Sequence, residues 1–110
     1  MERILKFDTV PSKYWSMKTK IEYLQRRIIV WSILYYDFDF SAISDYDYTC
    51  IAFQLAEMQN KNKTDAEKTK YWYAFYDFDG STGYHLYGRL SEEDKKHLSR
   101  IAQTVYENRR

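Results

Sequence analysis

The sequence predicts a mainly α fold, a small helical domain made by residues 1–110 as one unit. Apolar side chains recur three and four residues apart over long stretches, which is the period of an amphipathic helix. Two serines each open a capping box that marks a helix start. The chain has only three glycines and one proline, the residues that most often interrupt helices.

The first helix is predicted to run from Ser12 to about Asp37. Pro11 ends the segment before it, and the Ser12 hydroxyl can accept from the amides that follow. Because residues 28–36 are apolar nearly all round, this end of the helix is predicted to be buried. The apolar stripe consists of Tyr14, Met17, Ile21, Leu24, Ile28, Trp31 and Tyr35.

The second helix is predicted to begin at Ser44, after a tight connector over 37–43. The Ser44 hydroxyl can accept from the Asp47 amide, and the Asp47 carboxylate can reach back. Residues 60–63 are predicted to end the helix in a solvated loop. The two helices form an antiparallel pair over 12–60, and the core stripe of the second is Tyr48, Ile51, Ala52, Leu55 and Met58.

Residues 61–110 are predicted to form a Tyr-rich turn region and a C-terminal helix packed across the pair. Between 71 and 87 we expect short helical turns around Asp79-Gly80, with a short β-hairpin as the alternative. Ser91 opens the last helix, and Arg109 and Arg110 lie at its C-terminal end. Its stripe is Leu98, Ile101, Ala102 and Val105.

Composition excludes several classes of protein. No apolar run approaches the roughly 20 residues that cross a bilayer, and the charged start does not resemble a signal peptide. The missing apolar run means that no membrane partner is expected. With one cysteine, Cys50, the chain has neither an intrachain disulfide nor a cysteine-based zinc site, so a cytoplasmic location is expected. The sequence leaves the oligomeric state open.

Aromatic residues are unusually frequent, at 19% of the chain with 12 tyrosines. A domain of this size buries only about 60–65% of its unfolded surface, so some tyrosines must reach solvent, where they favour recognition of a protein partner. No catalytic triad, phosphate loop or metal-ligand pattern is visible, so no enzyme, catalytic residue or metal is expected. Asp77-x-Asp79-Gly80 lacks the later ligands of a calcium loop and is predicted to be a turn.

One segment carries a family pattern. Tyr35-Tyr36 is followed by the acid Asp39, then by Ile43-Ser44-Asp45 at a helix start, then by Asp47 and Tyr48. Over about residues 18–58 this arrangement resembles the N-terminal helical Ia subdomain of NAD-dependent DNA ligases, which recognises the nicotinamide mononucleotide (NMN) half of NAD. The resemblance implies a ligand-binding set of Tyr35, Tyr36, Asp45 and Tyr48, with NMN or NAD as the ligand.

The chain departs from that family in ways that matter. Thr49 stands where an aspartate should follow the tyrosine, Trp31 replaces a histidine, and Asp77 stands where the ligases carry their catalytic lysine before Asp-Gly. The resemblance therefore implies a non-catalytic module that binds a nicotinamide nucleotide or docks on a partner enzyme. The alternative is that Tyr35, Tyr36 and Tyr48 only pack the two helices together.

Two further functions fit the residues. A small phage or mobile-element protein can inhibit a host nucleic-acid enzyme, such as a CRISPR nuclease, by presenting an acidic face that imitates nucleic acid; the net charge of +1 counts against this. That face would be Asp37, Asp39, Asp45, Asp47, Asp77 and Asp79. Alternatively, an accessory protein can bind nucleic acid through the basic face of the first helix, formed by Lys13, Lys18, Lys20, Arg26 and Arg27.

Overall fold

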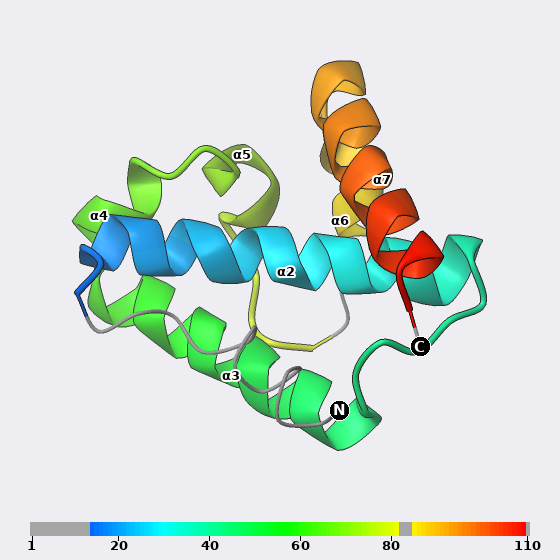
Figure 1. Ribbon diagram of the computed structural model, residues 1–110. Helices are drawn as coiled ribbons and strands as arrows, with labels where there is room; N and C mark the ends of the chain where they lie inside the picture. The colour runs from blue at the N-terminus through cyan, green and yellow to red at the C-terminus, as the bar shows by residue number, and fades with distance from the viewer. Residues whose placement is uncertain (1–13, 82–84, 110) are drawn as a thin grey trace.

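The computed structural model describes residues 14–81 and 85–109 and confirms the mainly α fold (Figure 1). The described part of the chain contains helices and no strand, so the region around 71–87 follows the helical prediction rather than the hairpin wherever it is described. The helices are α2 (Met17–Asp37), α3 (Asp45–Lys61), α4 (Lys63–Glu67), α5 (Trp72–Phe75), α6 (Leu86–Arg89) and α7 (Glu92–Glu107).

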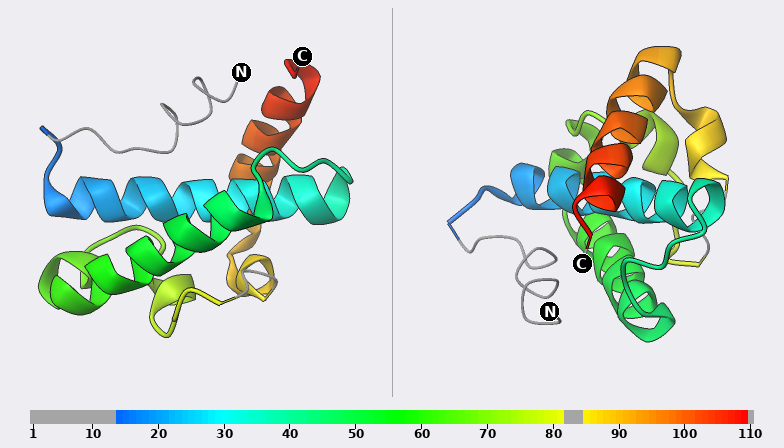
Figure 2. Two further views of the ribbon diagram at one scale, coloured as in Figure 1. Left: turned by 90° about the horizontal axis from the view of Figure 1, so that it is seen from below. Right: turned by 45° about the vertical axis from the view of Figure 1, so that its right-hand side comes forward.

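Helix α2 is the central element. Helix α3 runs back against it in the opposite direction, and α7 crosses it near its C-terminal end (Figures 1 and 2). The seven residues 28–34 are all buried, as the apolar composition of this stretch predicts. The predicted antiparallel helix pair is therefore present, and α7 packs mainly on α2 rather than across both helices of the pair.

The predicted start of the first helix is wrong. Helix α2 begins at Met17, and its N-cap is Ser16, whose hydroxyl accepts from the Thr19 amide at 3.2 Å. The Ser16 hydroxyl also donates to the Thr19 hydroxyl, so two hydrogen bonds to Thr19 hold the capping side chain in place. Tyr14 precedes the helix and is 85% exposed, so it is not part of the core stripe; Ser12 lies outside the described residues.

Helix α3 begins as predicted, with the Ser44 hydroxyl accepting from the Asp47 amide at 3.1 Å. The predicted loop over 60–63 is wrong, because α3 continues to Lys61 and α4 starts at Lys63. Asn62 allows this close succession: its backbone amide and its side-chain amide both donate to the Met58 carbonyl, and its own carbonyl accepts from Ala66. Burial of Ala66 then fixes α4 against the core.

The predicted turn at Asp79-Gly80 is confirmed. The Asp79 carboxylate accepts from the backbone amide and the hydroxyl of Ser81, and Gly80 adopts a φ of 88°. A Cβ on Gly80 would approach Phe53 Cδ1 to 2.7 Å, so the turn packs closely on α3. Arg89 of α6 forms two bonds to the Asp77 carboxylate and a third to the Ala74 carbonyl, which joins α6 to α5.

A buried chain of hydrogen bonds crosses the core between α2, α3 and α5. Gln25 donates to the side-chain oxygen of Gln59 at 2.8 Å, and Gln59 donates to the Phe75 carbonyl at 3.1 Å. Both glutamines are almost fully buried. The free-energy cost of burying polar groups is small while they are hydrogen-bonded and large when a partner is lost. These bonds therefore favour the one arrangement of the three helices in which the partners meet.

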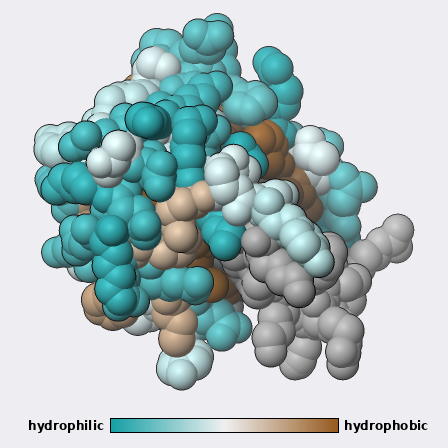
Figure 3. Space-filling view, turned by 90° about the vertical axis from the view of Figure 1, so that its left-hand side faces the viewer, coloured by the Kyte–Doolittle hydropathy of each residue, from teal (hydrophilic) through white to brown (hydrophobic). Residues whose placement is uncertain are grey.

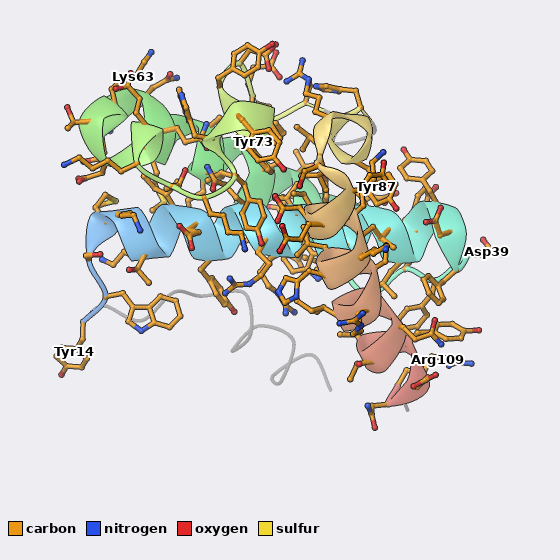
Figure 4. The ribbon with its side chains drawn as sticks, turned by 90° about the horizontal axis from the view of Figure 1, so that it is seen from above. Tyr14, Asp39, Lys63, Tyr73, Tyr87 and Arg109 are labelled. Carbon is orange, nitrogen blue, oxygen red and sulfur yellow. The ribbon has the colours of Figure 1, made fainter. Side chains whose placement is uncertain are left out.

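The start of α7 is fixed by its cap and by a tyrosine from α5. Ser91 accepts from the Asp94 amide at 3.1 Å, which confirms the predicted N-cap. Tyr73 donates its phenolic proton to Asp94, and Figure 4 shows this tyrosine reaching from α5.

The molecular face at the α4 end is largely hydrophilic, with a few apolar side chains visible between polar ones (Figure 3).

Candidate ligand-binding pocket

The four residues of the predicted ligand-binding set line one pocket. It lies where the last turns of α2, the connecting turn over 38–44 and the first turn of α3 meet, and its volume is about 230 Å³. Tyr35 and Tyr36 come from α2, whereas Asp45 and Tyr48 come from α3. Residues from two separate helices thus converge on one open concavity.

The end of α2 sets one wall of this pocket. The amides of Phe38 and Phe40 both donate to the Leu34 carbonyl, and Asp39 between them has a φ of 51°. Aspartate tolerates this left-handed conformation better than most residues because its short polar side chain can bond locally. The chain therefore reverses direction within a few residues beyond the end of α2, where Figure 4 labels Asp39.

The C-terminal end of α7 holds that reversal in place. Tyr106 packs its ring against Phe38 at 5.0 Å and against Phe40 at 5.7 Å between ring centroids. The guanidinium of Arg109 lies 3.6 Å from the centroid of the Tyr106 ring. Because aromatic pairs and cation–π contacts are directional, this cluster fixes the turn that carries Ser41, Ala42 and Ile43 into the pocket lining.

The pocket is aromatic, with a buried base and an exposed rim. Trp31 is 3% exposed and contacts Tyr48 edge-on, with ring centroids 6.4 Å apart. Tyr35 and Tyr36 are 54% and 52% exposed and meet at 88°, with centroids 5.0 Å apart. About half of Tyr35 and of Tyr36 faces solvent, so contact between the two helices covers only part of each side chain, whereas Tyr48 packs against the core.

The charge in the pocket lining comes from a single carboxylate. Asp45 belongs to the first turn of α3, where the helix dipole favours a negative charge. The lining residues include no lysine, arginine or histidine. Arg27 lies with its guanidinium 5.5 Å from the Trp31 ring centroid, so a cation contacts the pocket base without lining the pocket. The site therefore favours an uncharged or cationic group over an anion.

The structure does not bring the predicted basic set onto one face. At about 100° of rotation per residue, Lys20 and Arg27 share one side of α2, whereas Lys18 and Arg26 lie on another with Glu22 between them. Lys18 also pairs with Glu22 at 3.7 Å. Lys13 lies outside the described residues.

The two aspartates around Gly80 have structural partners. The Arg89 guanidinium, 2.7 Å from the carboxylate, lowers the pKa of Asp77, and the Ser81 bonds lower the pKa of Asp79. Across residues 14–81 and 85–109, no three side chains of histidine, cysteine, aspartate or glutamate gather as a metal site would require.

A second concavity, which the sequence did not reveal, adjoins the first. It measures about 460 Å³ and shares Ser32 and Tyr36 with the first pocket. Asp37, His85 and Tyr87 contribute the rest of its polar lining. No residue spacing predicts it, because it depends on the approach of α6 to the end of α2.

Comparisons of the chain with family models, curated proteins and solved structures found no match. Within the described part of the chain, the longest helix, α2, is too polar to span a bilayer, and the other helices are shorter.

Proposed function

We propose that the chain is a non-catalytic binding module whose pocket accepts the nicotinamide end of a nicotinamide nucleotide, NMN or NAD. The observation that carries this proposal is the convergence of Tyr35, Tyr36, Asp45 and Tyr48 on one open pocket. These four positions are the ones that the resemblance to the ligase Ia subdomain assigns to NMN. A pattern of residues along the chain and a concavity in the fold thus support the same ligand.

The chemistry of the lining matches that ligand. The oxidised nicotinamide ring is a flat cation, and the faces of tyrosine rings attract such a group. The Asp45 carboxylate can accept hydrogen bonds from the ribose hydroxyls. Pockets for whole drug-sized ligands measure roughly 300–1,000 Å³, so the smaller volume of this one suits a ring and its sugar rather than a complete dinucleotide.

The phosphate has no cationic partner in the pocket. With no lysine or arginine in the lining, the phosphate of NMN would extend into solvent, as would the adenylate half of NAD. The module therefore binds without promoting transfer of any group. This fits the absence from the sequence of a lysine before Asp79-Gly80, where the ligases carry their catalytic lysine.

A titration of isotope-labelled protein with NMN tests the proposal. Amide shifts should cluster in residues 31–48, and Tyr35→Ala should weaken binding ~10-fold through loss of ring stacking. Tyr46→Ala is the matched control, because Tyr46 is an exposed tyrosine of α3 outside the pocket lining and its loss should leave NMN binding unchanged. The absence of any shift at millimolar NMN would remove the proposal.

The separation of Lys20 and Arg27 from Lys18 and Arg26 weakens the nucleic-acid alternative, which depends on one continuous basic face. Binding of the chain to DNA or RNA at 50 mM salt that collapses as salt is raised would restore that alternative.

The inhibitor alternative requires a surface for a protein partner, and the outer side of α3 supplies one.

A further inference from the structure

Helix α3 has two stripes of apolar side chains, and only one of them is in the core. The inner stripe is buried against α2 and includes Ala52, Leu55 and Ala56. On the opposite side, Tyr46, Cys50 and Phe53 follow one another at spacings of four and three residues. Tyr46 is 76% exposed, Phe53 is 57% exposed, and Cys50 is exposed as well. We call these three residues the α3 outer face.

The outer face is not a row of loosely held side chains. Gly80 packs so closely against Phe53 that a Cβ added to Gly80 would lie 2.7 Å from Phe53 Cδ1 and 3.1 Å from Phe53 Cα. The turn that contains Asp79 therefore supports Phe53 from one side. Cys50, one helical turn away, raises the pKa of Tyr46. Side chains already ordered lose less entropy when a partner binds.

The stretch of chain that contains the outer face carries charge of one sign. Residues 28–60 contain none of the 17 lysines and arginines but five acidic residues, so this stretch carries a formal charge of −5 in a chain of net charge +1. The net charge of the whole chain conceals this separation. The five acidic residues are Asp37, Asp39, Asp45, Asp47 and Glu57.

Carboxylates beside the outer face have no cationic partner within the described residues. Asp47 follows Tyr46 directly, and Asp79 adjoins Gly80; neither takes part in an ion pair there. Glu57, one turn beyond Phe53, pairs with Lys61 at 3.1 Å and so marks where the acidic region ends. The face is thus an apolar centre with an anionic border.

We propose that the α3 outer face is a docking surface for a basic protein surface, one that places lysine and arginine side chains around an apolar or aromatic centre. Aromatic anchors inside a charged rim are the usual composition of protein interfaces. The border would repel nucleic acid and anionic lipid. A second copy of this chain, docked through the same face, would bring aspartates against aspartates and is disfavoured for the same reason.

Docking on the outer face does not depend on nicotinamide binding. Tyr35, Tyr36 and Tyr48 line the pocket, whereas Tyr46, Cys50 and Phe53 do not. The outer face also gives the inhibitor alternative a concrete surface, because enzymes that bind nucleic acid display basic surfaces.

The test uses two designed helical peptides of equal length, one of leucine and lysine and one of leucine and glutamate. The leucine–lysine peptide should shift the amides of residues 45–54 and 79–81, and its Kd should rise with salt. The leucine–glutamate peptide should cause no shift. The double variant Tyr46→Ala/Phe53→Ala should weaken binding ~10–30-fold, since both side chains are exposed aromatic anchors.

Substitutions elsewhere on the molecule localise the binding to the outer face. Tyr35→Ala should leave peptide affinity unchanged, which distinguishes the outer face from the pocket. Glu92→Lys/Glu93→Lys on α7 should also leave it unchanged, whereas Asp47→Lys should weaken it several-fold. Shifts spread over every acidic region, equal binding of both peptides, or no binding at millimolar peptide would each overturn the proposal. Sedimentation that shows a dimer abolished by Phe53→Glu would replace the basic partner with a second copy.

Discussion

Tyr106 of α7 packs edge-on against Phe40 of the turn that follows α2, with ring centroids 5.7 Å apart and ring planes at 78°. The two residues are far apart along the chain, and their contact joins the C-terminal end of α7 to a wall of the ligand pocket. A residue outside the pocket lining therefore positions the turn that contributes to it.

Replacement of Tyr106 by alanine should consequently affect both stability and binding. Loss of its contacts with Phe38 and Phe40 should lower the free energy of unfolding by about 1–3 kcal/mol and weaken NMN binding, because the turn loses its support. Tyr106→Phe keeps the ring and should restore most of both, since the ring makes the contacts with Phe38 and Phe40. Urea denaturation and NMN titration of the two variants measure the effects. An alanine variant with unchanged NMN affinity would show that the turn is held by other contacts.

The glutamine chain predicts an asymmetry between two substitutions of similar size. Gln59→Leu removes the acceptor for Gln25 and one of two donors to the Phe75 carbonyl, which keeps its bond from the Phe78 amide. The buried Gln25 side-chain amide is then left unpaired, at a cost of about 1–3 kcal/mol. Gln25→Leu leaves the Gln59 side-chain oxygen unpaired, but it also removes the Gln25 oxygen, which has no partner in the described structure, so it should lower the free energy of unfolding less. Thermal or chemical unfolding of both variants gives the comparison. Equal losses, or a larger loss for Gln25→Leu, would contradict the proposed role of Gln59 as the centre of the chain.

The ion pair of Asp77 with Arg89 predicts a pH dependence of stability. Arg89 holds the pKa of Asp77 below its ordinary value, so the pair stabilises the fold at pH values above the unfolded pKa of about 3.9 and loses this effect as pH falls through the lower folded value. Asp77→Asn should therefore be less stable than the natural chain at pH 7. The difference should shrink as pH falls below about 4 and vanish at lower pH. Denaturation curves across this range provide the check, and a difference independent of pH would refute the assignment.

Selectivity among nicotinamide compounds tests the character of the pocket. The oxidised ring is cationic and the reduced ring is neutral, so NMN should bind ~2–30-fold more tightly than its reduced form if cation–π attraction contributes. Nicotinamide riboside should bind about as well as NMN, because the lining offers the phosphate no cation. Competition titrations rank the three compounds. A strong preference for NMN over the riboside would mean that a basic group outside the described lining holds the phosphate.

Local signals in the sequence predict much of this fold. Ser44 and Ser91 cap the helices as expected, because a serine followed three residues later by an acid is a short-range pattern. The start of α2 is harder to place, because Ser12 and Ser16 both suit an N-cap and Pro11 favours the earlier one. The loop predicted after α3 is absent because Asn62 caps one helix while Ala66 packs the next.

The pocket is predictable in its residues but not in its openness. The spacing of Tyr35, Tyr36, Asp45 and Tyr48 carries the family pattern, yet only the packing of the helices and their connecting turn decides which side chains face solvent. The second concavity and the α3 outer face depend on how α6 and the Gly80 turn approach α2 and α3. Sequence periodicity does not report such approaches.

A crystal structure of the chain with bound NMN tests the central claim most directly. The account predicts the nicotinamide ring within ~4 Å of the Tyr35 or Tyr36 ring and a ribose hydroxyl within ~3.2 Å of the Asp45 carboxylate. The phosphate should point to solvent. An empty pocket at saturating NMN, or a ligand bound elsewhere on the chain, would contradict the claim.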